Sequence, residues 1–269
     1  MYKILATDMD GTILNSDKEI TKEVYDAVQD AKKQGKKIVL ATGRPLPGVT
    51  KYLEELHLNE EGDYVICFNG ALVQEVKTKK VLSNIEMTFS DFEKIQNLAN
   101  KHNMGIHINT PTEIVIPYET PNEYSVREAT INGLDIVSKT MEDIKENVTF
   151  CKVMVIDSPE ALEEFIPKIP SEMHEEFNIV RSAPFFLEFL HKDANKGVAL
   201  RTLCNHLGYS IDEAIAVGDE ENDKHMIEYA GLGVAMDNAR DSIKELANHI
   251  TTNNNDSGVA KVIKEFLLK

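Results

Sequence analysis

Apolar and polar residues alternate along the first 70 positions in blocks that indicate strands separated by helices. Short apolar runs at 2–7, 37–41 and 64–68 end in polar turns, which is typical of strands buried on both faces. Residues 21–34 carry apolar side chains at helical spacing, and residues 45–56 can form a second helix. Strands that alternate with helices in this way predict βαβ units and a parallel sheet.

The middle of the chain has a different texture, from about residue 85 to 188. Helical segments alternate with strands of alternating polarity, and seven of the nine prolines fall in this stretch. From residue 196 the first texture returns, with a helix and then a buried strand at 214–217. We therefore expect an α/β fold. Its Rossmann-like parallel-sheet core would come from residues 1–84 and 189–269, and residues 85–188 would form an inserted α+β cap domain.

The composition is that of an acidic globular protein, with a net charge of −16 and 42% hydrophobic residues. Such a charge repels nucleic-acid backbones and anionic membranes, so we expect no nucleic acid and no membrane as partners. The chain has no apolar run of membrane-spanning length, no visible signal peptide and three widely spaced cysteines, which predicts a cytoplasmic protein. An anionic ligand would need local positive charge from a metal, a lysine or a helix N-terminus.

Two carboxylates stand at the end of the first predicted strand, in the sequence DMDGT at 8–12. Asp8 and Asp10 are two residues apart, so in extended geometry both side chains point to the same side. The carboxyl edge of a parallel sheet is where open α/β folds bind ligands, and Gly11 allows a sharp turn there. Neighbouring carboxylates need a cation or a shared proton, and Mg²⁺ prefers oxygen ligands. The motif therefore favours a magnesium site.

A second acidic segment, GDEEND at 218–223, follows the buried strand 214–217 and lies at its carboxyl end. It places four acids within five residues, among them Asp219 and Asp223. A metal ion would neutralise part of this charge. An acidic helix N-terminus, favoured by the helix dipole, is the alternative interpretation.

Two further segments could bind phosphate oxygens. Thr42, Gly43 and Arg44 follow the strand 37–41, where a hydroxyl and loop N–H groups can hold phosphate ahead of a helix. Lys196 opens a helix after the inserted region and could supply the positive charge that the acidic surface lacks. Each signal is weak alone, because Thr-Gly is a common turn and a lone lysine is usually solvated.

Taken together and in this order, the four segments resemble the motifs of the haloacid dehalogenase superfamily of phosphotransferases. ATGRP at 41–45, FNGA at 68–71, NKG at 195–197 and GVAMDNA at 233–239 are similar to its Cof-type subfamily. These are bacterial enzymes with a large class IIB cap inserted after the third strand, and sugar-phosphate phosphatases are prominent among them. The resemblance covers nearly the whole chain.

The resemblance implies a Mg²⁺-dependent phosphatase of small phosphorylated metabolites. Asp8 would attack phosphorus and become phosphorylated, while Asp10 would protonate the leaving alkoxide and then deprotonate water. The metal would be held by Asp8, the backbone carbonyl of Asp10, and Asp219, with Asp223 in the outer shell. Thr42 and Lys196 would act on the transferring phosphoryl group. The implied phosphate-binding set is Gly11, Thr42, Gly43, Arg44, Lys196 and Asn222.

Two other functions stay open. A signalling or binding module with a phosphorylatable aspartate would share the acids, the threonine and the lysine, but it would lack the acid/base that Asp10 supplies. A phosphomutase on the same scaffold would return the phosphoryl group to a reoriented sugar. Hexose phosphates, other sugar phosphates and pyridoxal phosphate all fit the pattern as substrates. The cap would close over the site and select among them, with hinges near 83–85 and 187–191.

Overall fold

The computed structural model describes residues 1–269, and their contacts divide the chain into two compact units. Unit 1 consists of Met1–Gly43, Thr50–Ser83 and Asn195–Lys269, and unit 2 consists of Arg44–Val49 and Asn84–Ala194. The second boundary falls after Ala194, whereas the sequence predicted it after residue 188. The reason is strand β11 (Phe186–His191), which pairs along its length with two other strands of unit 2.

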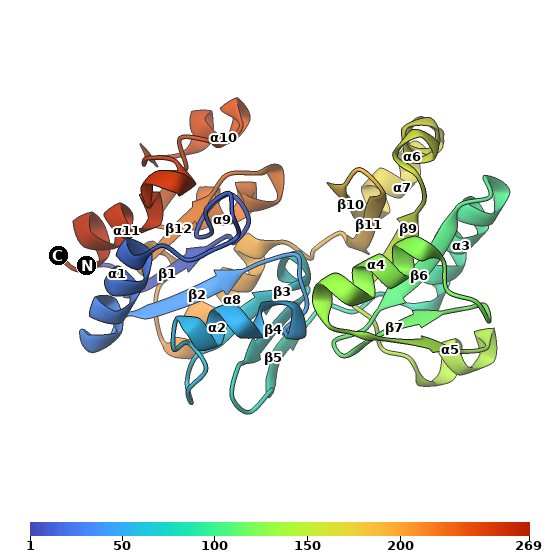
Figure 1. Ribbon diagram of the computed structural model, residues 1–269, viewed down its shortest axis with the longest axis horizontal. Coiled ribbons are helices and arrows are strands. Elements are labelled where there is room, and N and C mark those ends of the chain that lie inside the picture. The colour runs from blue at the N-terminus through green and yellow to red at the C-terminus, as the bar shows by residue number, and fades with distance from the viewer. The chain divides into compact units, whose positions relative to one another are not determined.

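Unit 1 contains an eight-stranded sheet in the order β14-β13-β12-β1-β2-β3-β4-β5 (Figure 1). The strands from β14 to β3 pair in parallel, and β4 turns back antiparallel to β3. The central pair, β1 and β12, joins the two ends of the chain. The strands are β1 (Ile4–Thr7), β2 (Lys37–Ala41), β3 (Tyr64–Cys67), β4 (Leu72–Glu75), β5 (Val81–Asn84), β12 (Ala214–Gly218), β13 (Leu232–Ala235) and β14 (His249–Ile250).

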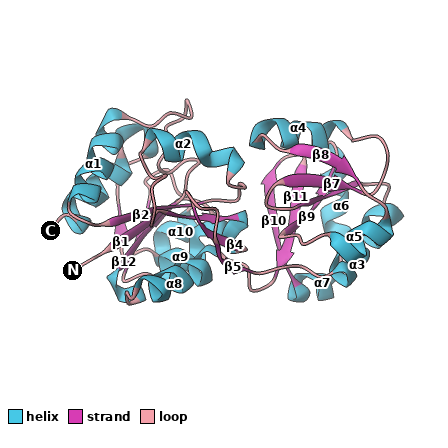
Figure 2. Cartoon of the chain, turned by 90° about the horizontal axis from the view of Figure 1, so that it is seen from below, coloured by secondary structure: helices cyan, strands magenta, loops and turns pink.

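Helices cover both faces of this sheet, with α1 and α2 on one side and α8 and α9 on the other (Figure 2). Helix α1 begins after Thr21, whose hydroxyl accepts a hydrogen bond from the backbone N–H of Val24, and the helix buries one apolar face. A parallel sheet with helices on both faces confirms the predicted α/β fold. The helices of unit 1 are α1 (Lys22–Lys33), α2 (Thr50–Glu55), α8 (Lys196–Leu207), α9 (Lys224–Tyr229), α10 (Asp241–Leu246) and α11 (Gly258–Val262).

Unit 2 contains a six-stranded sheet in the order β10-β11-β9-β6-β7-β8. Its pairs are antiparallel except for β7 with β8. The other strands are β6 (Gly105–Asn109), β7 (Glu113–Ile116), β8 (Asp135–Ser138), β9 (Lys152–Ile156) and β10 (Phe177–Ala183). The helices are α3 (Phe89–Lys101), α4 (Glu123–Asn132), α5 (Met141–Asn147), α6 (Pro159–Phe165) and α7 (Ser171–Glu176).

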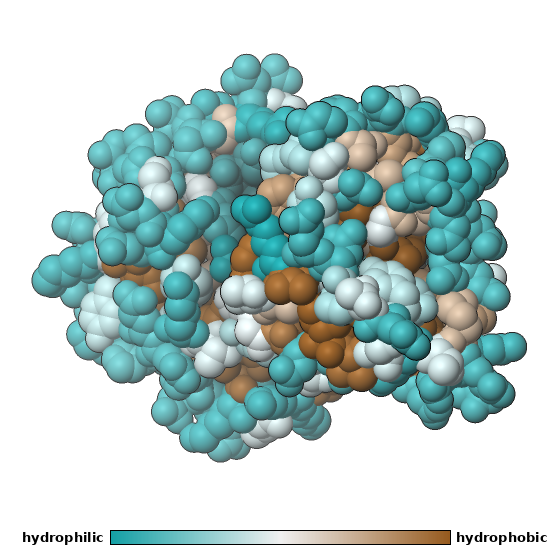
Figure 3. Space-filling model, turned by 45° about the vertical axis from the view of Figure 1, so that its right-hand side comes forward, coloured by the Kyte–Doolittle hydropathy of each residue, from teal (hydrophilic) through white to brown (hydrophobic).

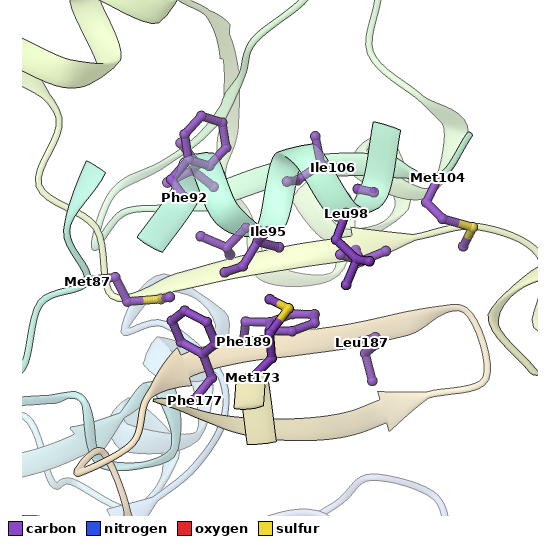
Figure 4. Packing of buried hydrophobic residues seen from close by; sticks show 14 of the residues in the cluster. Met87, Phe92, Ile95, Leu98, Met104, Ile106, Met173, Phe177, Leu187 and Phe189 are labelled. Atoms are coloured by element: carbon purple, nitrogen blue, oxygen red, sulfur yellow. The ribbon is translucent and has the colours of Figure 1, made fainter. Parts of the chain in front are cut away.

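One face of the second sheet is apolar. Figure 4 shows Ile95 and Leu98 of α3 directed toward side chains of the strands, among them Ile106 and Phe189, and all four belong to one buried cluster. Burying such side chains contributes roughly 1.5–3 kcal/mol each. This cluster contains twenty buried residues, compared with four and three in two smaller clusters of unit 2.

The other face of the same sheet buries charged side chains. Lys152 of β9 is 1% exposed, and its ammonium lies 3.1 Å from Glu188 of β11 and 3.7 Å from Glu128 of α4. Because side chains alternate along a strand, Lys152 faces away from its apolar neighbour Val153. The two carboxylates raise the pKa of Lys152 although burial opposes this, so the lysine stays charged.

Hydrophilic side chains cover most of the face seen in Figure 3, in keeping with the acidic composition. None of the helices has the length and the apolar run that crossing a membrane requires.

Candidate active site

The site is built on the end of the central strand of unit 1. Asp8 follows β1, and its backbone N–H donates to the carbonyl of Val217 in β12 at 2.9 Å, which extends the strand pairing by one residue. Lys196, the first residue of α8, is fully buried. Its ammonium donates to Asp8 Oδ1 at 2.5 Å and to Asp223 Oδ1 at 2.7 Å. Residues from three distant segments thus meet in one buried ion cluster.

A tight turn after Asp10 brings a further carboxylate close to this cluster. Gly11 has a φ of +84°, and a Cβ atom there would lie 2.3 Å from Asp219 Oδ2. Only glycine therefore allows Asp219 to approach the backbone. The hydroxyl of Thr12 donates to Asp219 Oδ1 at 2.6 Å and fixes the carboxylate from the same turn.

Asp223 organises the loop that follows β12. It is fully buried, and its Oδ2 accepts hydrogen bonds from the backbone N–H groups of Asp219 at 2.9 Å and Glu220 at 3.1 Å. Its Oδ1 accepts from Lys196. Because both oxygens already have donors, Asp223 is suited to orienting Asp219 and Lys196.

Burial is the main cause of the unusual ionisation in this cluster. Burial, reinforced by the carboxylates of Asp223 and Asp219, raises the pKa of Asp8 to about 8, although Lys196 lowers it. Burial also raises the pKa of Asp219 to about 6, against the hydrogen bond from Thr12. For Lys196, burial alone would lower the pKa, but Asp223 and Asp8 raise it. The lysine stays protonated, and a single lysine does not neutralise the three acids.

The donor set fits a hard dication such as Mg²⁺. Side-chain oxygens of Asp8, Asp219 and Asp223 lie within 4.8 Å of one another, and all three residues are buried. Carboxylate oxygens are the ligands that Mg²⁺ prefers. A nearby cation would favour the ionised carboxylates and so offset the effect of burial on the pKa values of Asp8 and Asp219.

Thr42 belongs to a second part of the site, which is held by Asn69. Thr42 is buried, and its carbonyl accepts the backbone N–H of Asn69 at 2.9 Å. The side-chain Oδ1 of Asn69 accepts from Asn222 Nδ2 at 2.9 Å, which ties the turn after β3 to the loop after β12. Asn69 adopts a left-handed φ of +52°, and the Cβ of any residue replacing Gly43 would lie 3.2 Å from its carboxamide.

The structure does not bring every predicted residue into the ion cluster. The carboxylate of Asp10 is half-exposed, and its Oδ1 accepts from the ammonium of Lys18 at 2.8 Å. Arg44 lies in the segment Arg44–Val49, whose contacts group it with unit 2. Asp8, Lys196, Asp219 and Asp223 are the predicted residues that meet directly.

Sequence reasoning missed three residues that hold the site together. Thr12 stands inside the DMDGT motif but was given no role, although its hydroxyl contacts Asp219. Asn69 and Asn238 stand in the FNGA and GVAMDNA segments, which were noted for their resemblance without a physical role. The signal for all three was a polar residue inside a recognised segment at a strand end.

The chain matches the family model of the haloacid dehalogenase-like hydrolases over residues 5–263. YxeH of Bacillus subtilis (strain 168) is 43% identical over 268 residues, which cover 100% of this chain and 99% of that protein. The 5-amino-6-(5-phospho-D-ribitylamino)uracil phosphatase YcsE of the same organism is 32% identical over 266 residues, covering 99% of this chain and 96% of that protein.

Among solved structures, a haloacid dehalogenase-like hydrolase from Bacteroides thetaiotaomicron is similar with a TM-score of 0.85 and 29% identity. The match covers 98% of this chain and 99% of that chain. The family model, the relatives and the solved structure each match almost the entire sequence. The chain therefore belongs to the haloacid dehalogenase-like hydrolases, and among them to the phosphatases.

Proposed function

We propose that the chain is a magnesium-dependent phosphatase that hydrolyses small phosphomonoesters, sugar phosphates above all, through an aspartyl-phosphate formed on Asp8. The observation that carries the proposal is the carboxylate of Asp8, held at the end of β1 by the ammonium of the fully buried Lys196. A carboxylate fixed beside a permanent positive charge can approach an anionic phosphate and act as a nucleophile.

The reaction runs in two steps. An oxygen of Asp8 attacks phosphorus, a new O–P bond forms, and the ester P–O bond breaks as the alkoxide takes a proton from Asp10. Water then attacks the phosphoryl group, Asp10 accepts its proton, and the carboxylate of Asp8 leaves as inorganic phosphate is released. Lys196 holds its proton throughout, because two carboxylates stabilise the ammonium.

The metal would be held by Asp8, Asp219 and the backbone carbonyl of Asp10, while Asp223 would orient them. When bound, it supplies positive charge that neutralises the carboxylates and the oxygens of the transferring group. The chain's own residues set the remaining geometry. Thr42 follows directly after β2, and its hydroxyl would bind a phosphoryl oxygen, while Gly11 and Gly43 would provide loop N–H groups.

The relative YcsE supports the substrate class, because its named substrate carries its phosphate on a ribityl chain. A phosphorylated polyol or sugar presents a primary phosphate on a flexible arm, which can reach a buried nucleophile. We expect unit 2 to provide the selection among such esters.

Phosphate release from a panel of sugar phosphates and other monoesters tests the proposal, with Mg²⁺ and with EDTA. Wild type and Asp8→Asn are compared with Asp26→Asn, a change of the same type at an exposed acid paired with Lys22. We expect Mg²⁺-dependent release in wild type and Asp26→Asn, and none in Asp8→Asn. Rapid turnover in Asp8→Asn would exclude the covalent route.

The same experiment separates the two other functions. A phosphomutase would convert a sugar phosphate into its isomer with little free phosphate, which product analysis detects. A binding or signalling module would release no phosphate and would keep a long-lived phosphoprotein after treatment with acetyl phosphate.

A further inference from the structure

The loop between β13 and α10 wraps around the metal-binding acid of unit 1. The backbone N–H of Met236 donates to the carbonyl of Gly218 at 3.1 Å, and the N–H of Arg240 donates to the carbonyl of Asp219 at 3.1 Å. Asp219 is therefore held through its backbone by a loop that stands near the end of the chain. No residue of this loop takes part in the two proposed steps of phosphate hydrolysis.

The carboxamide of Asn238, at the centre of this loop, reaches three other parts of the site. Its Nδ2 donates to the carbonyl of Gly11 at 2.8 Å and lies 3.5 Å from Asp219 Oδ2. Its Oδ1 accepts the backbone N–H of Asn254 at 3.0 Å. Asn254 in turn donates from its own side chain to the carbonyl of Leu14 at 2.9 Å.

These contacts restrain the carboxylate of Asp219 from two sides. Thr12 holds Oδ1 from the turn after Asp10, and Asn238 stands beside Oδ2 from the opposite loop. Asn238 also fixes the carbonyl of Gly11, the residue whose lack of a side chain lets Asp219 approach. A carboxylate whose rotation is restricted by such contacts loses less entropy when it binds a cation.

We propose that Asn238 is a positioning residue for the metal: it acts through Asp219 and the Gly11 turn and sets the affinity of unit 1 for Mg²⁺. The inference rests on the proposed function, because it assumes that Asp219 is a metal ligand. An open cavity of about 650 Å³ adjoins Gly11 and Asn238.

The chain offers a matched control for a merely structural role. Asn255 is exposed like Asn238, lines the same cavity, and also joins the C-terminal loop to the segment after Gly11. Its Oδ1 accepts the backbone N–H of Ser16 at 2.9 Å. No hydrogen bond links Asn255 to Asp219 or to Gly11, so it braces the loops without touching the metal-binding carboxylate.

The test is calorimetric titration of Mg²⁺ into metal-free full-length protein, with no substrate present. Wild type, Asn238→Leu and Asn255→Leu are compared, and thermal unfolding in EDTA shows that each variant is folded. Because outer-shell partners typically change metal affinity about 10–100-fold, we expect Asn238→Leu to raise the Kd for Mg²⁺ by that factor. Asn255→Leu should stay within about twofold of wild type.

Two results would overturn the inference: unchanged Mg²⁺ affinity in Asn238→Leu, or an equal loss in both variants, which would indicate loop packing alone. The wild-type titration separates this failure from failure of the proposed function. If wild type binds no Mg²⁺, the proposed function and the role of Asn238 are both wrong. If wild type binds Mg²⁺ and releases phosphate while Asn238→Leu binds Mg²⁺ equally well, only the proposed role of Asn238 is wrong.

Discussion

Replacing Asp8 by Asn should stabilise the metal-free protein while it abolishes turnover. Asp8 is 8% exposed, and burial, with smaller effects of neighbouring charges, raises its pKa from 3.8 to about 8. The folded state then binds the Asp8 proton more tightly than the unfolded state does. The contribution of this group to stability is therefore complete below pH 3.8 and is lost as the pH rises toward 8. Asn has a similar shape and does not titrate.

The size of the effect follows from the shift. A difference of about 4 pK units, at roughly 1.4 kcal/mol per unit, gives an upper limit of about 6 kcal/mol above pH 8. Part of this is offset, because the variant also loses the attraction between Asp8 and Lys196. We therefore expect the stability of Asp8→Asn relative to wild type to increase by roughly 2–4 kcal/mol between pH 5 and pH 8.

Urea denaturation in EDTA at pH 5, 6.5 and 8 measures this difference, with Asp26→Asn as the control. Asp26 is about half-exposed and paired at the surface, so its replacement should change stability by less than about 1 kcal/mol. Adding Mg²⁺ should narrow the gap by stabilising the folded wild type. A gap that stays constant from pH 5 to pH 8 would refute the assignment of a raised pKa to Asp8.

Three further changes probe the same cluster. Lys196→Met leaves two buried carboxylates without their cation, so we expect the free energy of unfolding in urea to fall by about 3–5 kcal/mol and phosphate release to cease. A decrease below about 1 kcal/mol would contradict this expectation. Gly11→Ala places a Cβ 2.3 Å from Asp219 Oδ2 at a φ of +84°, so thermal unfolding should show that the variant is less stable by about 1–3 kcal/mol. A variant as stable as wild type would contradict this prediction. Asp10→Asn should slow the chemical step by about 10²–10⁴-fold while the affinity for a phosphate analogue is retained. An equal decrease in the rate and in the affinity would instead assign Asp10 to binding.

The sequence predicted the core better than the inserted unit, and the helix α4 shows why. Its buried positions include Ser125, Glu128 and Asn132, so it has no apolar stripe at helical spacing. It covers the polar face of the second sheet, where Lys152 and Glu188 lie, and a polar helix that packs on polar groups gives no hydrophobic period. By contrast, α1 buries four apolar residues on one side, and its prediction over 21–34 agrees with the helix observed.

Local backbone chemistry set the ends of other elements. The helix predicted over 45–56 begins as a 3₁₀ turn at Pro47–Val49 and continues as α2, because prolines at 45 and 47 remove backbone donors. Near the C-terminus, α11 is followed by a single π-helical turn at Ile263–Leu267. Periodicity identifies such segments but does not distinguish between helix types.

For the site, the sequence indicated which residues gather but not what holds them. Strand ends predicted that Asp8 and Asp219 would share one edge of the sheet, and the family resemblance added Lys196, which opens a helix. The structure brings the three together. The contacts of Thr12 and Asn238 depend on how loops fold back, over separations of 207 and 227 residues. No local sequence pattern encodes contacts between residues so far apart, so the roles of Thr12 and Asn238 could not be predicted from the sequence.

The charge of the cluster indicates the order in which its ligands bind. Above pH 8, where Asp8 has lost its proton, three carboxylates and the ammonium of Lys196 give the cluster a formal charge of −2 on a protein of net charge −16, and it repels a phosphate dianion. A bound dication brings the sum to zero, so phosphate should bind only after the metal. Calorimetry should then detect no binding of inorganic phosphate in EDTA and clear binding with Mg²⁺. Equal affinity in both conditions would mean that Lys196 and the loop N–H groups suffice, and the electrostatic argument for a metal would fail.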